Sequence, residues 1–503
     1  MVFDVLVSKL ELLSRRIIEE TISHINNGEE KEFSRDYLKP EFYDFHYEPY
    51  GICYSVDLVP QQKIEWSSFD RALFFQNVIR KLPEYEQVRD AIREEYPASE
   101  ENRRAARALV RFAESVASKT YDGKTGKVLD KYVSILINDL RGGPIEWMCK
   151  SWLTGIWLEE ESHEVSPGLS IRRPKPIDLE EEWTIGIDSM KRMGYEEEFD
   201  PFIPTILNPG SEYGRLASPL KGGRLGQRII PKLSAIIELA CRARNIYEVS
   251  CKISLILDCM TFFGTGAAFQ IKTAMHPKSF VERPHIEGGY AKIPLESYDR
   301  MPPDYGYRGD YYQYQLNTLD MPKLARFIKQ MGELYPSQGI VCSLNRNSPV
   351  SIAFQRYQTA FLWSGITGQI TSSMMALEAL LLKESEKTES SHKLSQRTSV
   401  LMKFFGWHPF TVYRDVKKSY DIRSKYVHGS DHLLSDDRDA MERAKRALAY
   451  VRNTLLLFLL LKILDGKNKE AFIDEIDESL LAQHRHTELS KKIPQQRWLC
   501  HPR

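Results

Sequence analysis

The sequence has no long hydrophobic run and no paired cysteine motif. Its longest apolar stretch, Leu455–Leu464, is interrupted by Lys462, whereas a membrane span needs about 20 apolar residues. The N-terminus carries Asp4 and no basic lead-in, so we expect no signal peptide. The seven cysteines are scattered without a C-x-x-C pair, which argues against a disulfide framework and a structural zinc site. A reducing cytoplasm is the expected location.

The chain also lacks an overall charge, because 69 basic residues balance 69 acidic ones. This balance excludes a uniformly basic protein that coats nucleic acid. The charge is nevertheless segregated by region. Residues 159–200 carry a net charge of −8, whereas residues 215–244 and 391–430 each carry +6. Two basic regions are therefore candidates for binding a polyanion.

Strand patterns are scarce, and helical periodicity dominates the 503 residues. We predict helices in three places: an apolar stripe over residues 3–17, a segment from the N-cap Ser99 to about Ser118, and the apolar region 226–263. Only residues 339–343 suggest a strand. We therefore predict a mainly α protein with four consecutive parts: a larger, mostly helical N-terminal region of one or two subdomains (1–300), a linker (301–340), a helical domain (341–482) and a basic tail (483–503), which we expect to be mobile.

Four amphipathic segments in residues 341–482 predict a four-helix bundle. They are expected at 350–383, 393–404, about 409–428, and from just beyond 435. The third begins at Pro409, a residue favoured in the first helical turn, and ends at Gly429. Along it, Arg423 falls on the same stripe as Val416 and Tyr420. We therefore expect Arg423 to face a core or a partner rather than open solvent.

Four short segments of this domain show a family likeness. They are Arg356-Tyr357, the A-L-E-A-L of 376–380, the K-L-S-Q-R of 393–397 and the Y-D-I-R-S-K-Y-V-H-G of 420–429. In this context, the R-x4-H of the last segment resembles the motif of the HEPN superfamily, and within it the Apea-like branch found in bacterial anti-phage proteins. The likeness covers about a quarter of the chain. Ser424 departs from the Asn, Asp or His that follows the arginine in many catalytic members.

The resemblance implies a HEPN-type metal-independent endoribonuclease with Arg423 and His428 as catalytic residues. Arginine can offer a planar fork of donors to a phosphate, and histidine suits proton transfer because its ordinary pKa is about 6.5. The resemblance further implies a homodimer or higher even oligomer in which two motifs face one cleft. It also implies cleavage of tRNA or other RNA in abortive infection, with a phage-derived trigger. No metal, cofactor or membrane is expected.

Other residues are expected to support this site. Glu378 and Arg397 either orient Arg423 or form an internal ion pair, and Ser424, Asp421, Lys425 and Tyr426 flank the motif. The candidate RNA-binding residues are Arg224, Arg228, Lys232, Lys417 and Lys418. Two alternatives stay open: a catalytically silent HEPN module for dimerisation or for binding RNA or nucleotides, and a main activity located in the N-terminal region.

Overall fold

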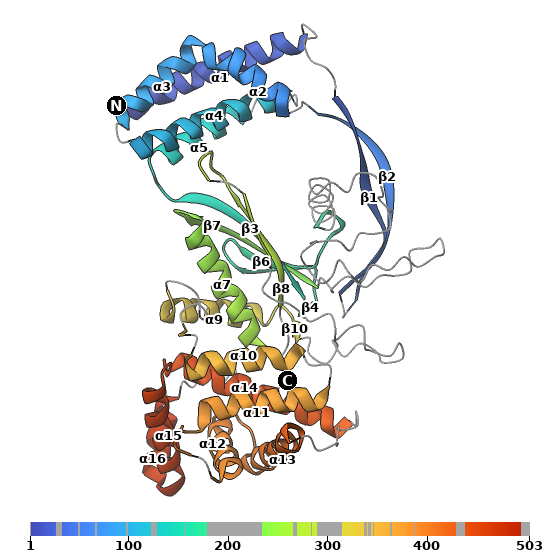
Figure 1. The fold of residues 1–503 in the computed structure, drawn as a ribbon, viewed down its shortest axis with the longest axis vertical. Coiled ribbons are helices and arrows are strands. Elements are labelled where there is room, and N and C mark those ends of the chain that lie inside the picture. The colour runs from blue at the N-terminus through green and yellow to red at the C-terminus, as the bar shows by residue number, and fades with distance from the viewer. Residues whose placement is uncertain are drawn as a thin grey trace.

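The computed structural model describes most of the chain. The described residues are 2–26, 33–48, 51–65, 68–96, 99–121, 128–154, 156–178, 234–264, 269–282, 284–288, 314–336, 340, 344–345, 347–362, 365–386, 388–428 and 438–493. They form an elongated molecule with helices at both ends and a small antiparallel sheet between them (Figure 1). The mainly helical class is confirmed. No helix among these residues is long and apolar enough to cross a membrane.

The N-terminal end is a cluster of helices. It contains α1 (Val2–Asn26), α2 (Ser68–Asn77), the short η1 (Ile79–Lys81), α3 (Pro83–Glu95), α4 (Ser99–Tyr121) and α5 (Val128–Leu140). The stripe predicted on α1 is confirmed, because Leu6, Leu10, Leu13 and Ile17 are all buried in this cluster. An antiparallel hairpin, β1 (Phe33–Glu48) with β2 (Gly51–Glu65), connects α1 to α2.

The central sheet has the strand order β5-β6-β7-β3-β8-β9 and is antiparallel throughout. Its strands are β3 (Ile145–Thr154), β5 (Ser162–Ser166), β6 (Leu169–Arg172), β7 (Ala235–Ala243), β8 (Phe269–Pro277) and β9 (His285–Gly288). A separate parallel pair joins β4 (Ile156–Leu158) to β10 (Tyr314–Leu316). Helices α7 (Ile246–Phe263) and α9 (Met321–Leu334) share a hydrophobic core with the sheet.

The prediction of a mostly helical N-terminal region did not include this sheet. Within 226–263, α7 is a helix as predicted, and Asn245 caps it by accepting a hydrogen bond from the Glu248 amide at 3.0 Å. Residues 235–243, however, form strand β7. Its apolar run around Ile236 and Ile237 is buried on both faces, and such a run has no period that distinguishes a strand from a buried helix. The strand predicted at 339–343 lies almost wholly outside the described residues.

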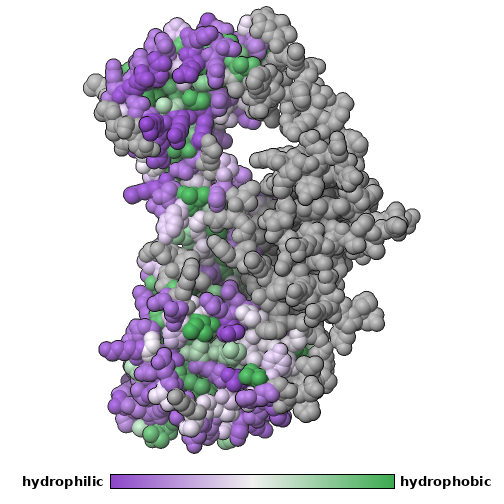
Figure 2. Space-filling model, viewed as in Figure 1, coloured by the Kyte–Doolittle hydropathy of each residue, from purple (hydrophilic) through white to green (hydrophobic). Residues whose placement is uncertain are grey.

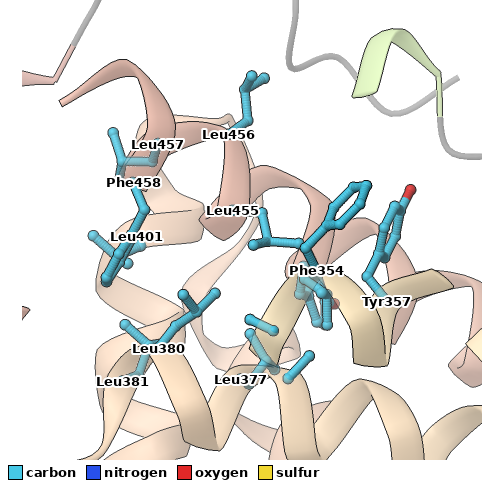
Figure 3. Close-up of a cluster of buried hydrophobic side chains, with 14 of the residues drawn as sticks. Phe354, Tyr357, Leu377, Leu380, Leu381, Leu401, Leu455, Leu456, Leu457 and Phe458 are labelled. Carbon is cyan, nitrogen blue, oxygen red and sulfur yellow. The ribbon is translucent and has the colours of Figure 1, made fainter. Parts of the chain in front are cut away.

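The C-terminal end is a second cluster of helices. It contains α10 (Pro349–Leu362), α11 (Ile366–Leu381), α12 (Ser390–Phe404), α13 (Pro409–Val427), α14 (Arg438–Leu460), α15 (Gly466–Leu481) and α16 (Gln483–Lys492). Helix α11 is buried almost all round and packs against α10, α12, α13 and α14. Figure 3 shows apolar side chains of α10, α11, α12 and α14 meeting in this core.

Three predicted boundaries differ from the structure. The single helix expected over 350–383 is two helices, α10 and α11, which pack against each other on either side of an interruption before Ile366. Part of the expected linker is folded, because 314–334 forms β10 and the amphipathic helix α9. Part of the expected mobile tail is helix α16, whose Leu489 is buried in the C-terminal core.

Candidate functional site

Helix α13 positions the two motif residues differently. Arg423 is partly buried, with 22% of its side chain exposed, and it forms an ion pair with Glu378 of α11. Its Nη2 donates to Oε2 of Glu378 at 3.1 Å. The guanidinium carbon also lies 5.6 Å from the centre of the Tyr420 ring, one turn earlier on α13. Arg423 faces inward, as expected from its stripe, and Glu378 is its ion-pair partner.

The ion pair with Glu378 leaves one hydrogen-bond donor of Arg423 without a partner among the described residues. The Nε of Arg423 is buried and makes no hydrogen bond among the described residues. Burial raises the pKa of Glu378, while Arg423 and Tyr420 oppose that rise. An arginine has five N–H donors in a fixed fork, and the hydrogen bond to Glu378 uses only one of the guanidinium nitrogens, Nη2.

His428 is exposed at the end of the same helix. It is the C-cap residue, and its backbone amide donates to the Ser424 carbonyl at 3.1 Å. Because His428 follows Arg423 by five residues, the two side chains leave the helix about 140° apart. Arg423 is directed towards α11 and His428 towards solvent. One copy of the chain therefore does not bring the two together.

A cleft of about 330 Å³ lies between α13 and α14, on the side of α13 away from Glu378. Its lining residues are Thr411, Arg414, Asp415, Lys417, Lys418, Asp421 and Arg443. Asp415 is already paired, since it accepts hydrogen bonds from Arg446 at 2.6 Å and from the Tyr450 hydroxyl at 3.1 Å. The described residues provide no ion-pair partner for the four cations of this cleft. The cleft is therefore a positively charged site.

Comparisons of this chain with protein-family models, with curated proteins and with solved structures find no match.

Arg397 belongs to a different part of the molecule. It is almost fully buried, at 1% exposure. Its guanidinium donates to both carboxylate oxygens of Glu386 at 2.7 Å, to Asp477 at 2.7 and 2.8 Å, and to the Leu381 carbonyl at 2.8 Å. These bonds join α12 to α15 and to the end of α11. Among the described residues, Arg397 forms no hydrogen bond with Glu378 or with Arg423.

The remaining predicted residues divide into three groups. Asp421, Lys425 and Tyr426 are exposed on α13, and Ser424 is half-buried. Lys417 and Lys418 line the cleft. Arg224, Arg228 and Lys232 lie outside the described residues. Within the described ranges, no group of three or more His, Cys, Asp or Glu side chains is arranged to hold a metal ion.

Two of the four cleft cations were not predicted. Arg414 precedes Lys418 by four residues on a helix, so its spacing already indicated a shared face. Arg443 lies on α14, and only the packing of α14 against α13 brings it to the cleft. No pattern in the sequence fixes that contact.

Proposed function

We propose that this chain is a metal-independent endoribonuclease of the HEPN type, with Arg423 and His428 as its catalytic residues. The observation that supports it best is the arrangement on α13: an arginine paired with a partly buried carboxylate, an exposed histidine at the helix end, and a cationic cleft on another face of the same helix. The motif resemblance supplies the reaction. Its role would be RNA cleavage in antiviral defence, with the N-terminal and central regions sensing a trigger or restraining the site.

The reaction needs two proton transfers and one charge stabiliser. The ribose 2′-hydroxyl loses a proton and attacks the phosphorus, and the 5′-oxygen leaves with a proton, which gives a 2′,3′-cyclic phosphate. Histidine can carry a proton in these steps. The fixed positive charge of Arg423 would oppose the charge that develops on the phosphate oxygens. Glu378 would restrict the guanidinium to one orientation.

The divergence of the two motif side chains supports a site shared between two copies. Arg423 and His428 leave the helix about 140° apart, and a second copy would let one phosphate meet an arginine and a histidine from different chains. We therefore propose a homodimer in which Arg423 of one copy and His428 of the other face the same phosphate.

A cleavage assay tests the residue assignment. Labelled RNA is incubated in EDTA with the wild type, Arg423→Ala, His428→Ala and the control His484→Ala, which changes an exposed histidine on α16. Loss of an acid–base group costs about 10²–10⁴-fold in rate. Equal products from the wild type and His428→Ala would remove the enzyme assignment.

A mixing experiment tests the shared site. Arg423→Ala and His428→Ala are each inactive on their own, but a mixed dimer retains one arginine and one histidine. If different copies supply the pair, co-refolded or co-expressed mixtures recover activity. Failure of mixtures that are shown to contain the heterodimer would contradict a site shared between copies.

A specific observation favours a second candidate, a catalytically silent module that binds RNA and dimerises. Arg423 has an internal partner in Glu378, which is 19% exposed, and this pairing is equally suited to stabilising α13 against α11. In that case, all the variants above would bind RNA, and none, including the wild type, would cleave it.

A further inference from the structure

One face of α13 is exposed along its entire length. Phe410, Arg414, Lys417, Asp421, Ser424 and His428 follow one another at alternating steps of three and four. This spacing places them on one stripe, which we call the outer stripe of α13. All of them are exposed except the half-buried Ser424. The stripe extends over about 27 Å at 1.5 Å per residue.

The outer stripe has an aromatic residue at one end and the motif histidine at the other. Phe410 has 73% of its surface exposed, and the ring centre of His408 lies 6.4 Å from that of Phe410. An apolar ring exposed to this extent at the start of a helix contributes little to the core. Exposed aromatic rings on basic surfaces commonly stack on unpaired bases.

The cleft lies beside the middle of the outer stripe and adds positive charge. Arg414 and Lys417 belong to both, and Lys418 and Arg443 widen the cationic surface towards α14. The Nε of Arg443 is buried without a hydrogen bond among the described residues. Because Arg446 neutralises Asp415, Asp421 is the one lining carboxylate without an ion pair in the described part of the chain.

We infer that the outer stripe and the cleft form a binding track for single-stranded nucleic acid. Phe410 stacks on a base, Arg414 and Arg443 bind phosphates in the cleft, and the strand continues along α13 to His428. The length of the stripe is sufficient for the smallest single-strand sites, which hold about four nucleotides. The direction towards His428 rests on the proposed function, whereas binding itself does not require cleavage.

Single-strand recognition follows from the combination of groups. A duplex would present its phosphates to the cations but would keep its bases stacked and unavailable to Phe410. A free base edge is not required, because ring stacking tolerates any base. The track therefore predicts a preference for unpaired RNA with little preference for sequence.

The test measures binding of a probe that cannot be cleaved. A fluorescent 2′-O-methyl RNA of about 12 nucleotides matches single-strand site sizes and lacks the attacking hydroxyl. Its affinity is measured over a range of salt concentrations for the wild type, Phe410→Ala and the double variant Arg414→Gln/Arg443→Gln. The controls are Tyr247→Ala, an aromatic residue 57% exposed on α7, and Arg80→Gln/Arg107→Gln, two exposed arginines of the N-terminal helices.

The two variants should fail differently. Phe410→Ala should weaken binding about tenfold with the salt dependence unchanged, because stacking is not ionic. The double arginine variant should reduce the slope of log affinity against log salt by about 1.4, since each phosphate contact on a single strand contributes about 0.7. A duplex probe should bind more weakly and should not respond to Phe410→Ala.

Three results would overturn the track. They are no binding by the wild type, equal losses in the test and control variants, and equal binding of duplex and single strand. If the probe binds as predicted but RNA is never cleaved, the proposed function fails and the track stands. If cleavage requires His428 while the track variants bind normally, the track fails and the proposed function stands.

Discussion

Arg397 is the most completely bonded cation in the C-terminal helices. Its five N–H donors meet two carboxylates and one carbonyl while the side chain is almost fully buried. The same contacts lower the pKa of Glu386 to about 2, chiefly through the hydrogen bonds from Arg397. Such a cluster stabilises the fold only while every partner is present, because an unpaired buried charge is costly.

We predict that Glu386→Gln destabilises the protein by about 3 kcal/mol at pH 7, since the buried Arg397 keeps only one of its two carboxylate partners and loses charged hydrogen bonds. The pH dependence should change as well. A carboxylate with a lowered pKa contributes stability above its unfolded value, and this stability is lost as pH falls from about 4.5 to about 2. Urea unfolding from pH 7 to pH 3 measures both effects. Glu384→Gln, an exposed neighbour, should leave them unchanged, and equal curves for the two variants would refute the prediction.

Glu378 differs from Glu386, because burial raises its pKa. It therefore takes up a proton at a higher pH than an ordinary glutamate, and the neutral form holds Arg423 less firmly. Folding favours that protonated form. The stability it contributes is present below about 4.5 and is lost as pH rises through the raised pKa. The proposed cleavage should have the opposite trend, because in that proposal the charged carboxylate of Glu378 holds Arg423.

We predict that Glu378→Gln slows cleavage and removes one step from the acid limb of its pH profile. The amide remains uncharged at every pH, so Arg423 loses its ionic anchor throughout. The profile of cleavage rate against pH measures this effect, with Glu384→Gln as the control. An acid limb unchanged in Glu378→Gln would show that Glu378 does not act through Arg423.

The sequence predicts single residues unevenly. The inward direction of Arg423 followed from its position on an apolar stripe, whereas Glu378, expected on the first helix of the domain, had two open roles: orienting Arg423 or forming an internal ion pair. For Arg397, the sequence left two roles open: it could orient Arg423, or it could form an ion pair with Glu378. Its actual partners, Glu386 and Asp477, lie in a loop and on a helix that was not predicted. Long-range pairing of this kind depends on packing, which spacing along the chain does not encode.

At the scale of elements, helices were predicted well where apolar residues recur every 3.6 positions and a capping residue marks the end of the segment. α13 begins at Pro409 and ends beside Gly429 as expected. The strands of the central sheet were missed because their core runs are continuous, as in β7, or short, as in β6. Their register depends on partners far along the chain, since β6 and β3 both pair with β7.

The turn between β5 and β6 allows a prediction about the sheet. Gly168 has φ +80°, and an added Cβ would lie 2.7 Å from the Ala240 carbonyl oxygen on β7. Gly406, after α12, has a similar φ of +82° but open space around it. A left-handed conformation costs a residue with a Cβ about 1–2 kcal/mol. Gly406→Ala should lose about that amount of stability, and Gly168→Ala clearly more. Urea unfolding measures the difference, and equal losses would contradict it.

At the scale of the whole molecule, α7 connects two cores. Its Val249, Ile253 and Ile256 pack under the central sheet, whereas Cys259 and Phe262 belong to the C-terminal core. Helix α9 likewise contributes Phe327 and Met331 to the C-terminal core. Cutting the chain near residue 340 would expose this shared surface. Point variants therefore separate an N-terminal from a C-terminal activity more cleanly than a truncation.

One buried arginine joins these cores across the end of α7. Arg452 of α14 donates from Nε to the Phe262 carbonyl at 2.7 Å and from Nη2 to the Phe263 carbonyl at 2.6 Å. These are among the last carbonyls of α7, which have no partner within the helix. The sheet packs on the same helix, so these hydrogen bonds connect the central region to α14, which in turn packs against α13.

We predict that Arg452→Met loosens the connection between the two cores without unfolding either. One buried and one partly buried carbonyl lose their donors, at a cost of about 1–3 kcal/mol each, so amide hydrogen exchange should become faster at the end of α7 and in the facing part of α14. Helices α1 to α5 should not change. The control is Arg446→Met, also on α14, because Arg446 bonds to Asp415 of α13 instead. It should affect exchange in α13 and leave α7 protected. If both variants accelerated exchange in α7 equally, the connection would depend on the general stability of α14 and not on the two hydrogen bonds of Arg452.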